Sequence, residues 1–249
     1  MGGGYIEDAP ILGGINSVAD IEFDEIIVSS ISGWDYIRLQ LISVGVEPSK
    51  INNQMAFVQV QARINFLRDF SSINPHIENE NLSVAEGGVY RGDFSKEINR
   101  YFPKQTLYLF DTFEGFDDKD ISYDKKHCYS DSENESYFAN TSVEEVLDKL
   151  PHKEQAIVKQ GFFPETTNGL EDEQFLFVNL DFDLYNPTYT GLEFFYPRVI
   201  SGGCILIHDY FTKKFKGIRE AVADFEKETG KPLLKIPIGD HISICILKN

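Results

Sequence analysis

Two apolar runs in this sequence end in side chains that can bind a cation. Asp181 directly follows the first run, and His208 and Asp209 directly follow the second. If both runs are strands of an open α/β sheet, these side chains lie beyond the carboxyl ends of the strands, where such sheets bind ligands. Oxygen ligands from two strand ends can hold a hard divalent cation. A cation beside a bound hydroxyl lowers its pKa, so the pattern predicts a site that prepares an oxygen nucleophile.

A glycine-bearing turn follows an earlier predicted strand. The sequence Glu86-Gly-Gly-Val-Tyr-Arg-Gly92 lies between a predicted strand at 82–85 and a predicted helix at 95–101. Glycines let the backbone approach a ligand closely, and a helix N-terminus presents free N–H groups. The spacing differs from the G-x-G-x-x-G dinucleotide fingerprint. Taken alone, the pattern is better explained by a tight turn between strand and helix that needs a positive φ.

An acidic residue ends the next predicted strand. Asp111 lies 24 positions after Gly87, and an acidic residue about 20 positions beyond a glycine-rich turn can accept hydrogen bonds from ribose hydroxyls. The alternative is a helix N-cap that merely ends the strand. The two motifs together favour a ribose-binding role for Asp111.

Strands and helices alternate from residue 82 onward, which predicts a mostly parallel sheet. The predicted strands are 82–85, 106–110, 156–159, 174–180, 204–207 and 241–247, and the predicted helices are 54–70, 95–101, 143–150, 192–199 and 218–229. The segment 117–137 is polar and acidic without a period, so we predict a mobile loop or lid there.

The N-terminal part predicts a small separate α/β fragment. A β-branched run at 23–30 precedes a helical spacing of apolar residues at 33–45. This piece resembles the second half of Rossmann-like modules that precede some sugar-modifying enzymes, without their first strand and glycine-rich turn. We interpret residues 1–50 as a partial accessory fragment and residues 51–249 as the main domain, and we assign no dinucleotide site to the fragment.

Composition narrows the class of protein. The 23 basic and 40 acidic side chains give a net charge of −17, which would repel a nucleic-acid backbone. The three cysteines form no CxxC pair, which favours a reduced compartment. No stretch reaches about 18 consecutive apolar residues, and no secretory signal is recognisable. We therefore expect a cytoplasmic protein with no nucleic-acid partner and no membrane association.

Five sequence blocks resemble the macrocin O-methyltransferase family, which includes the enzymes that methylate sugar hydroxyls of mycinamicin and novobiocin. The resemblance runs from about residue 55 to the C-terminus, with the blocks in order and at compatible spacing. The blocks are 85–92, 110–116, 161–166, 179–185 and 194–198.

The resemblance implies a class I S-adenosylmethionine-dependent methyltransferase fold, Rossmann-like, with a mostly parallel sheet and an antiparallel last strand. It also implies S-adenosyl-L-methionine as cofactor and a divalent metal, usually Mg²⁺. Carried over by position, the cofactor-binding residues are Glu86, Gly87, Gly88, Gly92, Ser95, Asp111, Thr112, Phe113, Gly161, Phe162 and Asp181. Asp181 also matches the metal ligand and proposed general base of the family, and Asp209 matches a second metal ligand.

One position departs from the family pattern. The family commonly has two adjacent acids after the fifth strand, where this chain has His208 and Asp209. Mg²⁺ prefers oxygen ligands, so His208 either binds the metal, with Mn²⁺ as an alternative to Mg²⁺, or orients Asp209 or a substrate hydroxyl. Asp183 remains a candidate for a supporting or substrate contact near Asp181.

The predicted function is metal-assisted O-methylation of a sugar hydroxyl on a glycoside, a polysaccharide unit or a nucleotide sugar. The expected partner is thus a small sugar-containing acceptor, and the family suggests a homo-oligomer, dimer or larger. The alternative is a non-catalytic protein that binds the cofactor or a sugar nucleotide. A metal-assisted hydrolase is disfavoured, because the chain has no G-x-S-x-G elbow and no His-rich metal cluster.

Overall fold

The computed structural model describes two compact units, Met1–Gln61 and Ala62–Asn249. Within them it describes residues 4–6, 9–11, 14–28, 34–129 and 138–249. Helix α2 (Gln54–Ile73) runs across the division between the units, which falls later in the chain than the boundary predicted after residue 50. None of the helices in the described ranges is long and apolar enough to cross a membrane.

The first unit is a small α/β assembly. Its elements are β1 (Gly4–Ile6), β2 (Ala9–Ile11), a 3₁₀ helix (Ile15–Asp20), β3 (Ile26–Ile27), α1 (Trp34–Ser43), a 3₁₀ helix (Pro48–Lys50) and β4 (Ile51–Asn52). Strands β3 and β4 pair in parallel, and α1 lies between them in the chain. Four buried side chains form the core: Val28, Leu41, Val46 and Ile51. A partial Rossmann-like accessory fragment stays the prediction for this unit.

The second unit contains a seven-stranded sheet in the described residues, in the order β10-β11-β9-β8-β5-β6-β7. The strands are β5 (Ser83–Gly87), β6 (Thr106–Asp111), β7 (Ala156–Gln160), β8 (Phe175–Leu180), β9 (Val199–Ile207), β10 (Leu234–Pro237) and β11 (Ile244–Leu247). The helices that follow α2 are α3 (Asp93–Tyr101), α4 (Asp118–His127), α5 (Val143–Lys149), α6 (Tyr185–Phe195) and α7 (Lys216–Thr229). Strand β11 pairs antiparallel with both of its neighbours, β9 and β10, whereas the other pairs of the sheet are parallel. The predicted fold class, with its antiparallel last strand, is confirmed.

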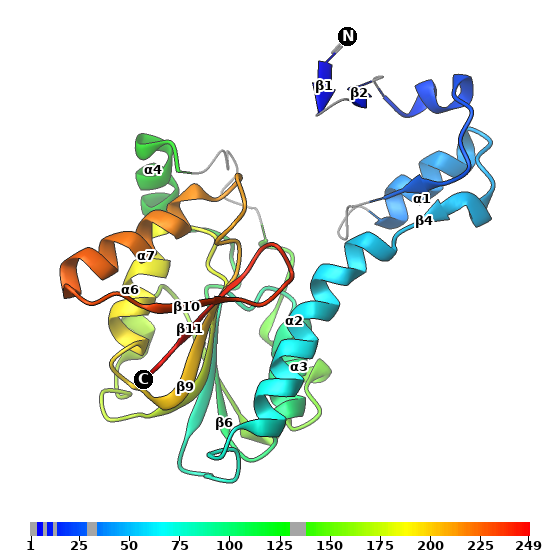
Figure 1. The fold of residues 1–249 in the computed structure, drawn as a ribbon. Coiled ribbons are helices and arrows are strands. Elements are labelled where there is room, and N and C mark those ends of the chain that lie inside the picture. Colours follow the sequence, from blue (N-terminus) through cyan, green and yellow to red (C-terminus); the bar gives the residue numbers. More distant parts are fainter. Residues whose placement is uncertain (1–3, 7–8, 12–13, 29–33, 130–137) are drawn as a thin grey trace. The chain divides into compact units, whose positions relative to one another are not determined.

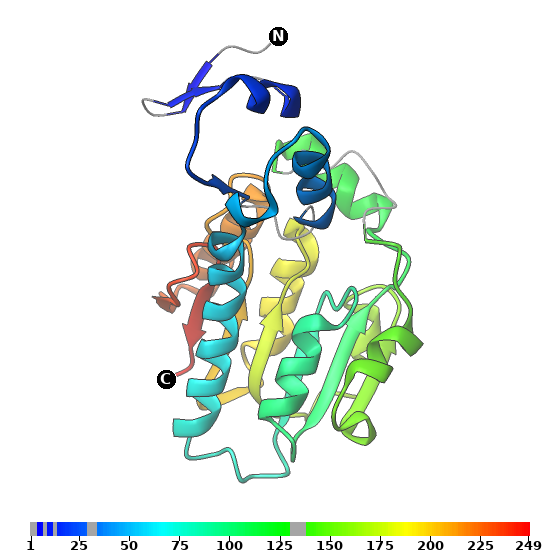
Figure 2. The same ribbon diagram turned by 90° about the vertical axis from the view of Figure 1, so that its right-hand side faces the viewer.

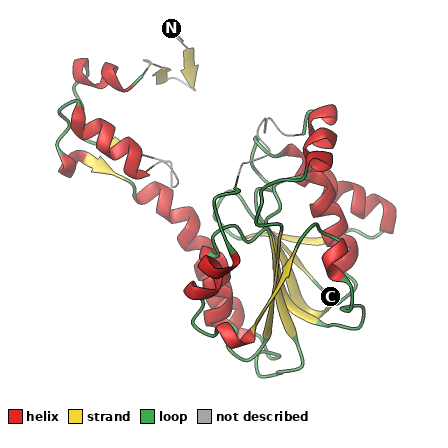
Figure 3. Cartoon of the chain, turned by 180° about the vertical axis from the view of Figure 1, so that it is seen from behind, coloured by secondary structure: helices red, strands yellow, loops and turns green. Residues whose placement is uncertain are grey.

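Helices cover both faces of this sheet (Figures 1 and 3). Side chains of a strand alternate between the two faces, and in β6 Leu107 and Leu109 pack with the core under α2, α3 and α5. Tyr108 and Phe110 point to the opposite core, under α6 and α7. Each strand is therefore apolar on both sides, as in a sheet buried between two helical layers.

The connections of the central strands diverge at the carboxyl end of the sheet. Strands β5 and β8 pair in parallel, but β5 leads into α3 on one face whereas β8 leads into α6 on the other (Figure 2). Such a point, where neighbouring strands send their connections to opposite faces, leaves a crevice that binds ligands in open α/β folds.

Two sequence-based predictions of elements are wrong, and one strand was not predicted. The predicted loop at 117–137 contains helix α4, which begins after the N-cap Asp117 and buries Asp120 and Asp124; buried acids on its inner face removed the apolar period, and residues 130–137 lie outside the described ranges. The predicted helix at 192–199 is α6, which begins and ends earlier, at Tyr185 and Phe195. Pro187 is tolerated in its first turn because no backbone donor is needed there. Edge strand β10 was not predicted.

Candidate active site

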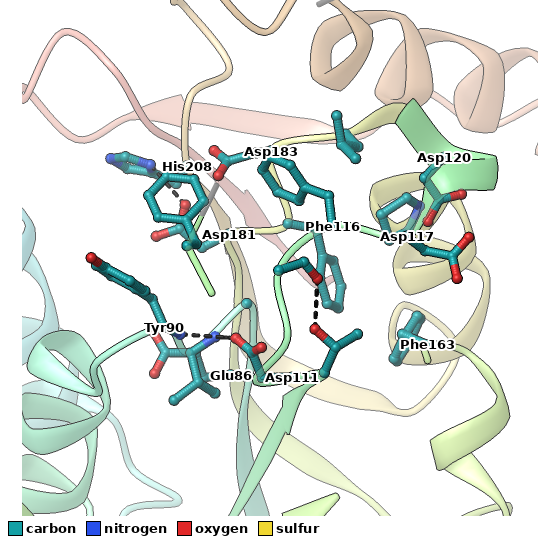
Figure 4. Close-up of a pocket in the computed structure, with 18 of the residues that line it drawn as sticks. Glu86, Tyr90, Asp111, Phe116, Asp117, Asp120, Phe163, Asp181, Asp183 and His208 are labelled. Carbon is teal, nitrogen blue, oxygen red and sulfur yellow. Dashed lines mark hydrogen bonds and ion pairs between the residues drawn. The ribbon is translucent and has the colours of Figure 1, made fainter. Parts of the chain in front are cut away.

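A cavity of about 340 Å³ opens at the carboxyl ends of the central strands. Figure 4 shows Glu86 and Asp111 on one side of it, Asp181, Asp183 and His208 gathered on another. These residues end or follow β5, β6, β8 and β9. The cavity thus lies where the fold predicts a ligand, and it brings the glycine turn together with the cation-binding side chains.

The glycines of the turn let the ends of β5 and β8 touch. A Cβ on Gly88, where φ is +81°, would lie 2.0 Å from the carbonyl oxygen of Asp181. A Cβ on Gly87 would lie 2.2 Å from the ring of Phe182, and one on Gly92 would lie 2.8 Å from Val146. These glycines are therefore required by close packing of the chain. This packing fixes the position of Asp181 relative to the glycine turn.

Glu86 is buried at the end of β5 and is held on both sides. The hydroxyl of Ser95 donates to its carboxyl group, and Nδ2 of Asn179 donates to Oε1 at 3.0 Å. Burial raises the pKa of Glu86 to about 8, against the lowering effect of the Ser95 hydrogen bond. The side chain is thus largely neutral at pH 7 and can both donate and accept a hydrogen bond.

Asp111 organises the backbone around the cavity. Its Oδ2 accepts from the backbone N–H groups of Val89 (2.7 Å) and Tyr90 (2.8 Å), and its Oδ1 accepts from that of Phe113 (2.7 Å). The hydroxyl of Thr112 donates to the carbonyl of Gly115 at 2.6 Å and closes the next bend. The carboxylate therefore ties the glycine turn to the end of β6.

The predicted site residues fall into two groups. Those that line the cavity are Glu86, Gly88, Asp111, Thr112, Gly161, Phe162, Asp181, His208 and Asp209. The other four, Gly87, Gly92, Ser95 and Phe113, are not among the lining residues; Phe113 is buried in the core beneath α3, and Ser95 reaches the cavity through Glu86.

Three potential metal ligands converge at the ends of β8 and β9. One ligand atom each from Asp181, His208 and Asp209 lies within 4.8 Å of the other two. Nδ1 of His208 is 2.8 Å from Oδ1 of Asp181 and 3.1 Å from Oδ2 of Asp209. Yet this buried nitrogen makes no hydrogen bond of acceptable geometry with any described residue. A nitrogen this close to two carboxylates, without a well-aligned hydrogen bond to either, fits a bound cation.

The same nitrogen is basic enough to carry a proton instead. Burial and Arg63 lower the pKa of His208, but the carboxylates of Asp181 and Asp209 outweigh both effects and raise it to about 9. For Asp181, burial raises the pKa, but His208 and Arg63 outweigh it and bring the pKa to about 2. Asp181 is thus ionised at neutral pH, and a proton and a metal ion would compete for His208.

Asp183 stands next to this cluster in a constrained backbone. The strand ends at Leu180, and Asp183 has a φ of +64° and is 8% exposed. Burial and the charges of Asp181 and Asp209 raise its pKa well above the ordinary value. Asp183 therefore faces the cavity as a carboxyl group that can donate a hydrogen bond.

Sequence reasoning missed several groups around the cavity. Arg63 of α2 contacts Asp181 directly. From α4, Asp120 lines the cavity and accepts from Nδ2 of Asn186 at 3.0 Å. Phe138 packs its edge on Tyr90 and also meets Phe116, and all three rings line the cavity. The clustered aromatics at 113–116 were the only available signal, since Arg63 and Asp120 lie in segments without a motif.

Comparison with known proteins places this site in a family. The sequence profile of the macrocin-O-methyltransferase family (TylF) matches residues 61–240 of the 249. The chain belongs to this family. It is an O-methyltransferase, and S-adenosylmethionine is the cofactor expected for its family. The matched range contains all five sequence blocks and every candidate site residue, so the predicted family is confirmed.

Two solved structures share the fold of this methyltransferase. The O-methyltransferase NovP is 21% identical with a TM-score of 0.60, over 76% of this chain and 80% of NovP. The calicheamicin methyltransferase CalS11 is 15% identical with a TM-score of 0.57, over 88% of this chain and 93% of CalS11. No curated protein sequence matches the chain. At these identities the two structures support the architecture.

Proposed function

We propose that this methyltransferase transfers a methyl group from S-adenosylmethionine to a sugar hydroxyl of a glycoside, a polysaccharide unit or a nucleotide sugar, with a divalent cation at the acceptor. One observation carries the proposal. Asp181 joins the two halves of the cavity: its backbone carbonyl lies against Gly88 of the turn, whereas its carboxylate faces His208 and Asp209.

The cofactor half would be built from the glycine turn and the strand ends beside it. Glu86 and Gly88 line the part of the cavity beside Asp181, where the methionine portion would bind, and Asp111 and Thr112 line the part next to β6, where the ribose would bind. Phe162 lines the cavity after β7 and supports a position beside the adenine. When bound, S-adenosylmethionine supplies an electrophilic methyl group on a sulfonium.

The chemistry assigned to the protein is mainly positioning and proton transfer. Holding two reactants in line contributes most to reactions of this kind. Asp181, ionised and with Oδ1 turned toward the cluster, would accept the proton of the attacking hydroxyl. Asp183, which lines the cavity beside Asp181, would form a hydrogen bond with a second acceptor oxygen. The rings of Tyr90, Phe116 and Phe138 would exclude water from the reacting groups.

The cation site would consist of Asp181, His208 and Asp209. When bound, a divalent cation supplies Lewis acidity at the acceptor oxygens. One imidazole nitrogen with two carboxylates suits Mn²⁺ at least as well as Mg²⁺, which prefers oxygen alone. We therefore propose either Mn²⁺ or Mg²⁺ as the metal of this site.

The acceptor class rests on the family and on charge. The family is named for methylation of macrocin, and the sequence blocks resemble enzymes that act on sugar hydroxyls. The net charge of −17 disfavours a nucleic-acid acceptor. A cytoplasmic location and a homo-oligomeric state remain predictions.

The test begins with calorimetric titration of S-adenosylhomocysteine into the wild-type protein and Asp181→Asn. Methyl transfer is then measured by mass spectrometry with dTDP-, UDP- and GDP-sugars and with methyl glycosides, with added Mg²⁺ or Mn²⁺ and with EDTA. We expect both proteins to bind S-adenosylhomocysteine. We expect the turnover of Asp181→Asn to be lower than that of the wild type by a factor of about 10² or more.

Two outcomes would contradict the proposal. Wild-type protein that binds neither S-adenosylhomocysteine nor S-adenosylmethionine is no methyltransferase of this kind. Binding without transfer to any acceptor of the panel would favour the alternative, a non-catalytic protein that binds the cofactor. Transfer that survives both EDTA and Asp181→Asn would remove the roles assigned to the cation and to Asp181.

A further inference from the structure

Arg63 lies beside the proposed base and is not part of any sequence motif of the site. Its Nη2 donates to Oδ2 of Asp181 and to Oδ1 of Asn179, both at 3.2 Å. Its guanidinium packs over the ring of Phe94, with Cζ 4.2 Å from the ring centre. The side chain is 12% exposed. Arg63 is thus a largely buried cation held by two strand-end residues and an aromatic ring.

The two carboxylate oxygens of Asp181 contact different basic side chains, Arg63 and His208. Oδ2 accepts from Arg63, whereas Oδ1 is the oxygen 2.8 Å from His208. A carboxylate held in this way presents a single oxygen to the cluster and cannot chelate a metal ion with both. The rotation of the carboxylate is limited because Arg63 is itself stacked on Phe94.

Arg63 also connects this cluster to the cofactor side of the cavity. Asn179 accepts from Arg63 through Oδ1 and donates to Glu86 through Nδ2. The guanidinium acts electrostatically on Glu86, Asp181 and His208. Its Nε is buried and has no hydrogen-bond partner among the described residues, so the hydrogen bonds of Nη2 and the stacking on Phe94 are the contacts that orient the guanidinium toward Asp181.

We propose that Arg63 is a positioning residue for methyl transfer: it holds Asp181 as a one-oxygen ligand and weakens divalent-cation binding at Asp181, His208 and Asp209. The inference rests on the proposed function of that cluster. A guanidinium beside the cluster repels a dication and offsets one of the carboxylate charges. The cation is then held loosely, and Oδ1 remains available to an acceptor hydroxyl that enters the same site.

This role predicts effects of opposite sign on metal binding and on turnover. A neutral residue at position 63 frees Oδ2 and removes the repulsion, so the cation binds more tightly. The carboxylate loses its fixed direction, so methyl transfer slows. Damage to the fold would instead weaken metal binding, cofactor binding and turnover together.

The test is titration of Mn²⁺ into the full-length protein, followed by the electron paramagnetic resonance signal of free Mn²⁺. We expect Arg63→Gln and Arg63→Met to bind Mn²⁺ about threefold more tightly or better than wild type, and Arg63→Lys, which keeps the charge, to stay within about twofold. The matched control is Arg68→Gln, because Arg68 lies on the same helix, is half exposed and pairs with its neighbour Asp69. It should bind Mn²⁺ as the wild type does.

S-adenosylhomocysteine affinity and melting temperature are measured on the same samples to establish that each variant is folded. Where an acceptor from the sugar panel is turned over, the neutral variants should show a kcat about tenfold lower with a KM within about threefold. Methionine keeps the packing on Phe94, so Arg63→Met keeps the test valid if Arg63→Gln does not fold.

Equal or weaker Mn²⁺ binding in a folded neutral variant would overturn the proposal, as would the absence of Mn²⁺ binding in wild type and variants alike. Failure of the proposed function is seen separately. A wild-type protein that binds Mn²⁺ but neither S-adenosylhomocysteine nor any acceptor would refute methyl transfer, while the comparison of Mn²⁺ affinities would still decide the role of Arg63 at the cluster.

Discussion

The contact between the glycine turn and the end of β8 can be tested with one methyl group. In Gly88→Ala the new Cβ would lie 2.0 Å from the carbonyl oxygen of Asp181 and 2.6 Å from its carbonyl carbon. An ordinary carbon–oxygen contact is about 3.3 Å or longer. The two strand ends must therefore separate by roughly 1 Å, and this displacement moves the residue proposed as the base away from the turn.

The matched control is Gly169→Ala. Gly169 has a φ of +82°, against +81° for Gly88, and a Cβ there meets no atom within 4 Å. Both substitutions carry the cost of an L-residue at positive φ, about 1–2 kcal/mol. Only Gly88→Ala adds overpacking, typically about 1–3 kcal/mol. We thus expect the free energy of unfolding to fall by about 2–5 kcal/mol in Gly88→Ala and by about 1–2 kcal/mol in the control.

Thermal unfolding and calorimetric binding of S-adenosylhomocysteine measure the two consequences. For a domain of this size, about 2–4 °C of melting temperature corresponds to 1 kcal/mol, so Gly88→Ala should melt clearly below Gly169→Ala. A misplacement of about 1 Å can reduce turnover about 10²-fold, whereas the control should bind and turn over as wild type does. Equal melting temperatures and equal S-adenosylhomocysteine affinities in the two variants would refute the reasoning.

Three further predictions concern charges at the site and under α4. Burial raises the pKa of Asp124 to about 7 from 3.8, so the stability that its protonated form contributes is lost as pH rises through 7. In urea unfolding, the free energy of unfolding of Asp124→Asn should therefore rise by about 1–3 kcal/mol relative to that of the wild type between pH 5 and pH 8. The control Asp118→Asn, at an exposed position of the same helix, should show no such relative rise. His208→Asp restores two adjacent acids, so Mg²⁺ affinity, measured by competition with Mn²⁺, should rise about tenfold relative to Mn²⁺; an unchanged ratio would exclude His208 as a ligand. Asp111→Asn weakens three backbone hydrogen bonds and should lower S-adenosylhomocysteine affinity about tenfold; unchanged affinity would show that the turn does not depend on the carboxylate.

The sheet was predictable because its strands are apolar on both faces and are separated by helices of ordinary length. Each predicted strand from 82 to 207 overlaps an observed one. The misses have local causes. Helix α4 carries acids on its buried side, and the short edge strand β10 is only half apolar. Helix α6 begins at Tyr185, before the predicted start at 192, and has Pro187 in its first turn, where proline is tolerated.

The strand-end part of the site was predictable for a similar reason. Asp111, Asp181 and Asp209 each follow an apolar run, and parallel strands bring such positions to one edge of the sheet. The structure adds that the glycines of the turn are required by protein packing at Gly87 and Gly88. Sequence alone could not distinguish this packing from an approach of the backbone to a ligand, because both require the absence of a Cβ.

Groups that come from helices were not predictable, and they determine how the strand-end residues behave. Arg63 is 118 positions from Asp181, and nothing in the composition of α2 says which of its polar residues faces the sheet. In the same way, Asp124 of α4 accepts from the first backbone N–H of α6 at 3.2 Å, a cap supplied by a helix far away in sequence. The strand ends supply the types of ligand and base, whereas the direction of each carboxylate is set by the helix packed against it. A change of function in this fold can therefore arise at α2 or α4 while every strand-end residue stays the same.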